Sequence, residues 1–285
     1  PPPPVTRLRP GHADLPGVVK FGLNDVRNVL ERASARETAS RVAAGALGKV
    51  FLRQFGIEVR SHVRSIGPAR ANTPAELELA ADGASHSWWQ QVEESPIRTG
   101  DTEFESAATE LIKAARTAGD TLGGIFEVIA YGLPIGLGTY AQWDERLDGR
   151  LAAAVMSIQS IKAVELGDGF ANAARHGDQE RGWSRPTNRA GGLEGGVTNG
   201  MPVIVRGAAK PISTLINPLP SIDYATRQRD VAHVERSDVC VVPAAGVVGE
   251  AMVALVLADA VRWKFGGDGL DEALANFRSF VAANG

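Results

Sequence analysis

A long apolar segment near the C-terminus constrains the fold of this chain more than any other feature. Residues 247–265 show a helical pattern that is apolar almost all round, and such a helix must be buried between other elements. Its most apolar part, residues 251–258, is bounded by Glu250 and Asp259 and is far shorter than the roughly 20 residues of a membrane span. We therefore predict a soluble protein whose core helix lies between two sheets or two subunits. No role is assigned to Asp259.

Composition excludes several classes of function. The chain has 285 residues with no internal repeat and no clean linker, which we interpret as a single domain over residues 1–285. Its formal net charge is −3, so no basic field points to nucleic acid. The one cysteine, Cys240, excludes an intramolecular disulfide and fits the reducing cytoplasm. We expect no metal site and no membrane association.

Periodic patterns predict the remaining elements. Strands are expected at residues 57–66 and 122–130, and helices at 38–52, from 101 onward, at 151–158 and at 268–283, with a short helix beginning at 73–76. Trp88 and Trp89 are predicted to be packing residues rather than ligand contacts. Prolines predict irregular structure at 215–231, Pro243 and Gly246 predict a break in the chain, and 233–240 is interpreted as the end of a strand.

A glycine-rich segment at residues 188–214 is the first candidate site. Five glycines lie between Gly191 and Gly200, and Lys210 later precedes Pro211, Ile212, Ser213 and Thr214. Glycine lets backbone N–H groups approach a ligand closely, and a lysine with two hydroxyls adds a charge and two small donors. We favour a ligand cradle, with the polar residues 172–187 as a mobile lid; a flexible surface loop is the alternative.

A capped helix provides a second candidate site. Ser34 and Glu37 have capping-box spacing before the helix at 38–52. Arg32 and Arg36 flank the cap, where free N–H groups and the helix dipole favour an anion. This pattern indicates a phosphate site. The alternative is a surface helix with two solvated arginines.

His12 is the third candidate. It is set between an arginine, Arg9, and a carboxylate, Asp14. Histidine titrates near neutrality, so adjacent charges can adapt it for acid–base chemistry. The alternative is a solvated loop histidine.

The glycine pattern at 136–141 is a weaker motif. It matches G-x-G-x-x-A after a predicted strand, as in a dinucleotide-binding fold. Asp144, Glu145 and Arg146 intervene before the next helix, however, and no clear strand–helix–strand unit surrounds the pattern. We therefore favour a turn, and a nicotinamide-dependent oxidoreductase remains a less favoured alternative.

Taken together, the motifs resemble the chorismate synthase family. The resemblance covers nearly the whole chain in the family's order, in the stretches RPGHAD (9–14), RASARETASRVAAGAL (32–47), SIQSIKAVELGDGF (157–170), TNRAGGLEGGVTNG (187–200), KPIST (210–214) and RSDVCVVPAAGVVGEAM (236–252).

This resemblance implies a cytoplasmic, homotetrameric lyase of the shikimate pathway, which makes precursors of aromatic amino acids. Such an enzyme removes phosphate and a ring proton from 5-enolpyruvylshikimate 3-phosphate, in an anti-1,4 sense, to give chorismate. The reaction requires reduced FMN, for which NADPH is a candidate reductant. The implied fold is an α+β sandwich of helices between antiparallel β-sheets.

The resemblance also implies roles for individual residues. His12 and Asp238 would be catalytic, and Arg9, Arg36 and Asn188 would bind substrate. The FMN site would be formed by Arg32, Ala33, Ser34, Gln159, Ser160, Gly195, Lys210, Pro211, Ile212, Ser213, Thr214 and Arg236.

One departure from the family is large. The family begins with a segment that carries a Gly-Glu-Ser-His-Gly motif and a second essential histidine, and nothing in this sequence matches it. We therefore expect a C-terminal part comprising roughly the last three quarters of the family's length. Such a part would lack strands at its N-terminus and would be inactive alone. A non-catalytic fragment that binds FMN or phosphate is the corresponding alternative.

Overall fold

The computed structural model describes residues 3–74, 84–176 and 187–284. Two of the predicted segments overlap residues outside these ranges. The predicted helix start at 73–76 lies partly outside the described residues, and the predicted lid at 172–187 lies mostly outside them.

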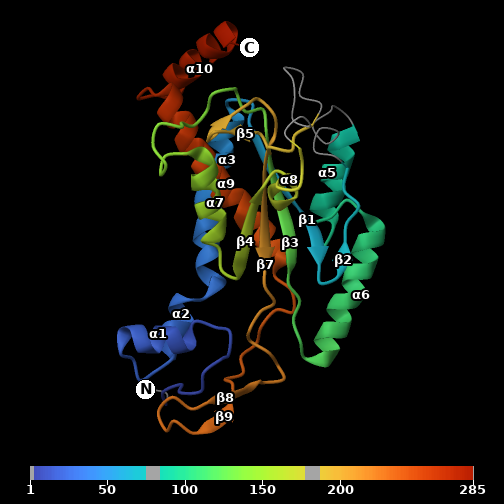
Figure 1. Ribbon diagram of the computed structural model, residues 1–285, viewed down its shortest axis with the longest axis vertical. Coiled ribbons are helices and arrows are strands. Elements are labelled where there is room, and N and C mark those ends of the chain that lie inside the picture. Colours follow the sequence, from blue (N-terminus) through green and yellow to red (C-terminus); the bar gives the residue numbers. More distant parts are fainter. Residues whose placement is uncertain (1–2, 75–83, 177–186, 285) are drawn as a thin grey trace.

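A five-stranded antiparallel sheet forms the centre of the fold. Its order is β2 (Ala69–Arg70), β1 (Glu58–Ile66), β3 (Gly124–Tyr131), β7 (Val203–Ala209) and β4 (Ile161–Leu166). The strands expected at 57–66 and 122–130 are confirmed as β1 and β3. With helices on both faces (Figure 1), the architecture is mixed α+β.

The long apolar segment forms helix α9 (Val242–Phe265), which packs on one face of the sheet. Helices α3 (Thr38–Arg53) and α7 (Leu147–Met156) lie beside it, and α10 (Leu270–Asn284) follows it (Figure 1). Among the described residues, α9 is the one helix long and apolar enough to cross a membrane, but 61% of its most apolar window is buried within the chain. It is therefore a core helix, as its pattern predicts.

The predicted break before this helix was wrong. Helix α9 begins at Val242 and includes both Pro243 and Gly246. Proline fits the first helical turn, where its missing N–H would have no intrahelical partner. Gly246 lies where a Cβ would be 3.2 Å from the Ser61 hydroxyl, so close contact with the sheet favours glycine.

Small residues let the helices approach the sheet and one another closely. A Cβ at Gly249 would lie 2.6 Å from the Phe126 ring, and Gly207 meets the same ring from β7. Gly45 of α3 lies against Ala251 of α9 without room for a methyl group. These contacts fix α9 between α3 and the sheet.

The opposite face of the sheet carries a buried row of charges. Glu127 binds His62 at 2.8 Å and also Arg206, which in turn contacts Glu165 at 3.1 Å. Trp88 of helix α5 (Ala84–Glu94) lies against the His62 ring, and Trp89 is 3% exposed. Both tryptophans are therefore packing residues, as expected, with Trp89 buried and Trp88 partly buried. Helix α6 (Thr102–Ala118) begins at its N-cap Asp101, as expected.

A small unit lies beyond one end of the sheet (Figure 1). It contains α1 (Asp14–Phe21), α2 (Arg27–Arg32), the 3₁₀ turn η1 (Ala35–Glu37), and a hairpin of β8 (Pro220–Ile222) and β9 (Arg229–Val231). The expectation of irregular structure at 215–231 was therefore wrong for the two three-residue strands, although no long regular element forms there. The hairpin is stabilised by contacts from distant residues, because Ile222 packs on the cluster around Leu8 and Val18.

Two further expectations differ from the structure. Residues 233–240 form no strand and make a single bridge, from Cys240 to Leu122. Within the described residues, one large sheet covers one side of the helical layer. The other sheets there are two-stranded hairpins, β8–β9 and β5–β6 (Leu193–Glu194, Val197–Thr198), and neither is the second large sheet of the expected sandwich. A second sheet over these helices thus remains a prediction.

The short helix α8 (Gly169–Asn172) follows β4.

We predict that Gly45→Ala lowers the free energy of unfolding by about 1–3 kcal/mol, because the added methyl group overlaps Ala251. Gly48→Ala is the matched control on the same helix. Its Cβ would make an ordinary 3.4 Å contact with Ala254, so this change should be neutral or stabilising by up to about 1 kcal/mol. Urea unfolding of both variants measures the difference, and equal stabilities would contradict the close α3–α9 packing.

Candidate functional site

A cleft of about 490 Å³ lies between the small unit and the end of the helical layer. We call it the candidate cleft. It brings together predicted site residues from five separate segments: Arg9, His12, Ala33, Ser34, Arg36, Gln159, Ser160, Ile212, Ser213, Thr214, Arg236 and Asp238.

Sequence reasoning missed the apolar floor of the candidate cleft. Ala244, Ala245 and Val248 from the first turns of α9 line it. Ala244 and Ala245 were missed because the helix was expected to begin only at residue 247. Pro243, which fits a first helical turn, was the signal that could have located them.

The start of the α3 segment forms one wall. Ser34 accepts a hydrogen bond from the Arg36 N–H at 3.3 Å, so the cap exists. The reciprocal half of the predicted capping box is absent, because the Glu37 carboxylate instead binds Arg41 and Gln159. Arg36 is 82% exposed and its partner is Glu31 at 3.5 Å. A weakly held guanidinium at this position can bind an anion.

The turn between α7 and β4 forms another wall and carries two signs of a ligand site. The buried Oε1 atom of Gln159 has no hydrogen-bond partner among the described residues. Ser160 has φ of +69°, a left-handed conformation that is costly for a residue other than glycine. Strain and an unsatisfied buried acceptor are both typical of functional sites.

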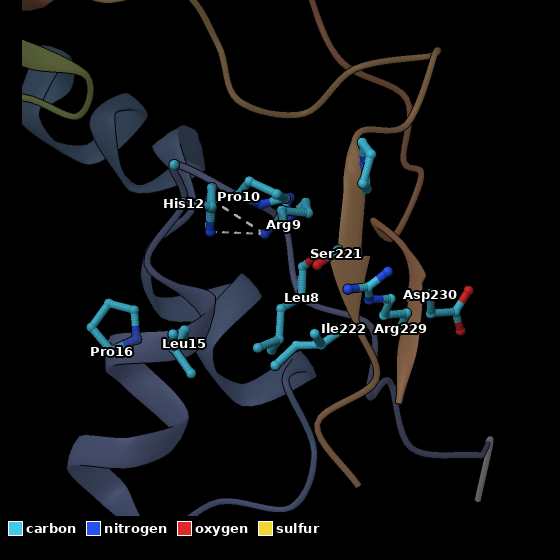
Figure 2. A pocket seen from close by; sticks show the side chains of 12 residues that line it. Leu8, Arg9, Pro10, His12, Leu15, Pro16, Ser221, Ile222, Arg229 and Asp230 are labelled. Carbon is cyan, nitrogen blue, oxygen red and sulfur yellow. Dashed lines mark hydrogen bonds between the residues drawn. The ribbon is translucent and has the colours of Figure 1, made fainter. Parts of the chain in front are cut away.

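Arg9 and Asp14 form a buried ion pair, and Figure 2 shows the Arg9 side chain beside His12. Arg9 is 6% exposed and also donates to Thr214 at 2.9 Å. Burial raises the pKa of Asp14, but hydrogen bonds from His12 and Arg9, together with the charge of Arg9, outweigh burial and hold that pKa well below its usual range. Arg9 is thus engaged within the chain, so its predicted contact with substrate would require an exchange of partners.

Arg236 and Asp238 lie on the other side of the candidate cleft, and both are exposed. The described residues contain no ion pair between these two side chains. Their charges therefore remain free for a ligand. No cluster of metal-ligating residues occurs among the described residues.

The proposed glycine-rich cradle does not form as a single site. Gly195 is exposed in the β5–β6 hairpin, whereas Lys210 follows β7 and donates to the Gly11 carbonyl. Seven residues of β7 separate Pro202 from Lys210, and a strand rises about 3.3 Å per residue. The glycine loop and Lys210 therefore lie at opposite ends of the sheet.

Three other predicted residues also lie outside the lining. Asn188 is 5% exposed and closes the glycine loop, since its side chain bonds Gly192 and Pro202 at 2.8 Å each. Arg32 and Pro211 are exposed neighbours of lining residues in the chain.

The glycine pattern at 136–141 is not a dinucleotide-binding loop. The preceding strand, β3, pairs antiparallel with both β1 and β7, whereas that fold requires parallel strands. Gly138, with φ of +98°, packs against the Gly196 carbonyl in a turn. The oxidoreductase alternative is therefore wrong.

We predict that Ser160→Gly raises the free energy of unfolding by up to about 1 kcal/mol, because glycine relieves the left-handed strain. Ser160→Ala removes the hydroxyl but keeps the Cβ, so it should give no such gain. Urea unfolding of the two variants provides the measurement. Equal stabilities would show that position 160 is unstrained.

Known proteins share the sequence and the fold. The family described as chorismate synthase matches residues 4–261. The chain is 53% identical to the chorismate synthase of Symbiobacterium thermophilum, covering 97% of this chain and 71% of that protein, and 55% identical to that of Nocardia farcinica, covering 98% and 69%. A crystal structure of chorismate synthase superposes with a TM-score of 0.81 at 43% identity, over 95% of this chain and 76% of that one. The chain therefore belongs to the chorismate synthase family.

Proposed function

We propose that the candidate cleft is the site where this chorismate synthase binds reduced FMN and 5-enolpyruvylshikimate 3-phosphate. The observation that carries this proposal is the convergence of five separated sequence segments on one cleft. The reaction is the anti-1,4-elimination of phosphate that gives chorismate. The reaction releases phosphate and a ring proton. Its site therefore needs space for a departing anion, an acceptor for the proton and an apolar surface that excludes water.

The residues present fit a flavin. The volume of about 490 Å³ lies within the range of small-molecule sites. Ala245 and Val248 offer an apolar floor, and the buried Gln159 Oε1 can accept a hydrogen bond from a ligand N–H. We propose that Ala33, Ser34, Gln159, Ser160, Ile212, Ser213, Thr214 and Arg236 hold FMN, with Arg32, Lys210 and Pro211 supporting them.

Reduced FMN held by these residues would supply electron density to the allylic system of the substrate and recover it, so that no net redox change would occur. Within the chain, we assign Arg36 to a phosphate or carboxylate of the substrate, because its guanidinium is exposed and weakly paired. His12 is the acid near the departing phosphate. Asp238, a cleft-lining carboxylate without an ion-pair partner among the described residues, is the proton acceptor.

Assembly and reductant are further parts of the proposal. Exposed apolar side chains on α3 and α9, namely Leu47, Val50 and Trp263, support association into a homotetramer in the cytoplasm. Gly195 lies at the far end of β7 from this cleft, so it could reach FMN only in another subunit. NADPH remains a proposed reductant, and the glycine turn at 136–141 does not contribute to its binding.

We predict that Arg36→Ala raises KM for the phosphorylated substrate much more than Kd for FMN. Loss of a charge-assisted anion contact costs about 2–4 kcal/mol when the oxygens that it served stay buried in the complex. Arg53→Ala, at the other end of α3, is the control and should change neither constant. Steady-state kinetics and flavin titration provide both numbers. Equal effects of Arg36→Ala on substrate and flavin would place this arginine in the flavin site or in the scaffold.

We predict that His12→Ala and Asp238→Asn each lower kcat by about 10²–10⁴ while FMN still binds, as expected for acid–base groups. FMN affinity, melting temperature and single-turnover rate are measured on the same samples. A loss of activity that merely follows the folded fraction would assign both residues structural roles. FMN binding by a wild-type chain without turnover would favour the non-catalytic alternative.

A further inference from the structure

His12 is held by a carboxylate that the catalytic proposal does not use. The Nδ1 atom of His12 lies 2.6 Å from Oδ1 of Asp14 in the turn that begins α1. Asp14 is fully buried, whereas the His12 side chain is 20% exposed. The carboxylate therefore sits behind the ring, on the side away from solvent.

Arg9 fixes the orientation of this carboxylate. Its backbone N–H, Nε and Nη2 donate to Asp14 at 2.9, 3.0 and 3.1 Å. Its remaining nitrogen, Nη1, donates to Thr214 at 2.9 Å and contacts Glu235 at 3.5 Å. With its donors used in this way, Arg9 supports Asp14 rather than presenting an open fork to a substrate.

The protonation state of Asp14 determines which ring nitrogen of His12 carries hydrogen. The pKa of Asp14 is held well below its usual range, because hydrogen bonds from His12 and Arg9 outweigh the effect of burial. The group is therefore an ionised carboxylate at neutral pH. A carboxylate can only accept hydrogen bonds, so the short contact requires a hydrogen on Nδ1.

Arg9 also contacts the His12 ring. Its Nη2 atom lies 3.0 Å from Nδ1 and 3.3 Å from Nε2 of His12. Nδ1 faces the ionised Asp14 carboxylate at the shorter distance of 2.6 Å and carries the hydrogen, so Nε2 is the ring nitrogen that can accept from Nη2. Other charged groups near this turn come from other elements, and they are Glu31, Arg36, Lys210, Glu235, Arg236, Asp238, Arg229 and Asp230.

We propose that Asp14 is a positioning residue that holds neutral His12 with its hydrogen on Nδ1 and leaves Nε2 as the atom that exchanges a proton. Arg9 acts through Asp14 by fixing the carboxylate. The effect on the reaction rests on the proposed function, whereas the tautomer itself does not. His12 lines both the candidate cleft and a second hollow of about 660 Å³, formed by Leu8, Leu15 and the β8–β9 hairpin (Figure 2), so its ring is accessible to ligand or water.

His62 provides an internal reference with the opposite arrangement. Its Nε2 atom, not Nδ1, lies 2.8 Å from a buried carboxylate, that of Glu127. Its Nδ1 atom has no partner among the described residues. The same reasoning therefore places the hydrogen of neutral His62 on Nε2, and the two histidines should differ in one spectrum.

The test is ¹⁵N NMR of histidine-labelled wild-type protein, in which ring ¹⁵N shifts and two-bond couplings identify the tautomer. The chain has five histidines, and His12→Gln assigns the His12 signals. Above neutral pH we expect His12 with hydrogen on Nδ1 and His62 with hydrogen on Nε2. Neutral His12 with its hydrogen on Nε2 would overturn the proposal.

Variants test the charge of Asp14 separately. Asp14→Asn keeps the shape of the side chain but removes the ionised carboxylate that requires a hydrogen on Nδ1, so the neutral His12 ring should show a measurable share of the tautomer with hydrogen on Nε2. Asp25→Asn, which removes a carboxylate that binds Val5 and Arg27 in the same small unit, should leave the His12 tautomer unchanged. A wild-type tautomer in folded Asp14→Asn would contradict the proposal. If that variant does not fold, Asp14→Glu retains the charge and should keep the hydrogen on Nδ1 of His12. That result, together with the tautomer of the wild-type protein, then decides the proposal.

Flavin titration of the same samples separates this inference from the proposed function. Wild-type protein with hydrogen on Nδ1 of His12 but without FMN affinity would contradict the flavin site and leave the role of Asp14 intact. FMN binding by a protein whose neutral His12 carries its hydrogen on Nε2 would support the flavin site and contradict the role of Asp14.

Discussion

The close contact between α9 and the central sheet is the interaction on which the rest of the structure depends. Gly246 and Gly249 place the helix backbone directly over Phe126, which also meets Gly207. A larger residue at any of these glycines would push the helix outward, because interiors are close-packed. The first turns of α9 supply the cleft floor, so this packing also sets the depth of the candidate cleft.

Charges are used differently on the two sides of the molecule. On the sheet face under α5, Glu127 is buried with His62 and Arg206. Burial raises the pKa of Glu127, but the hydrogen bond from His62 and the charges of His62, Arg206 and Arg64 lower it to about 2. In the candidate cleft, by contrast, Arg236 and Asp238 have no ion-pair partner among the described residues. Charges that the fold itself satisfies indicate structure, whereas charges left unsatisfied at a cleft indicate a ligand.

The sequence predicted most elements because their patterns are local. The period of the helix at 38–52 and the alternation of 57–66 both appear in the structure, with small shifts at their ends. The β8–β9 hairpin was missed, because it is held by contacts with residues more than two hundred positions earlier. Only the Ser34 half of the predicted capping box forms, again because of a contact with a distant residue. Glu37 binds Gln159, which lies on a distant segment.

By itself, the sequence determined the family, the core helix and the chemical types of the site residues, because motifs and hydrophobic periods are read along the chain. Only the tertiary structure decided which motifs share a cleft. The antiparallel sheet separates Gly195 from Lys210 by the length of β7 and brings Arg9 against Thr214, 205 positions later. Sequence spacing cannot show this, because the direction and register of each strand are set by packing against α9 and by pairing with other strands.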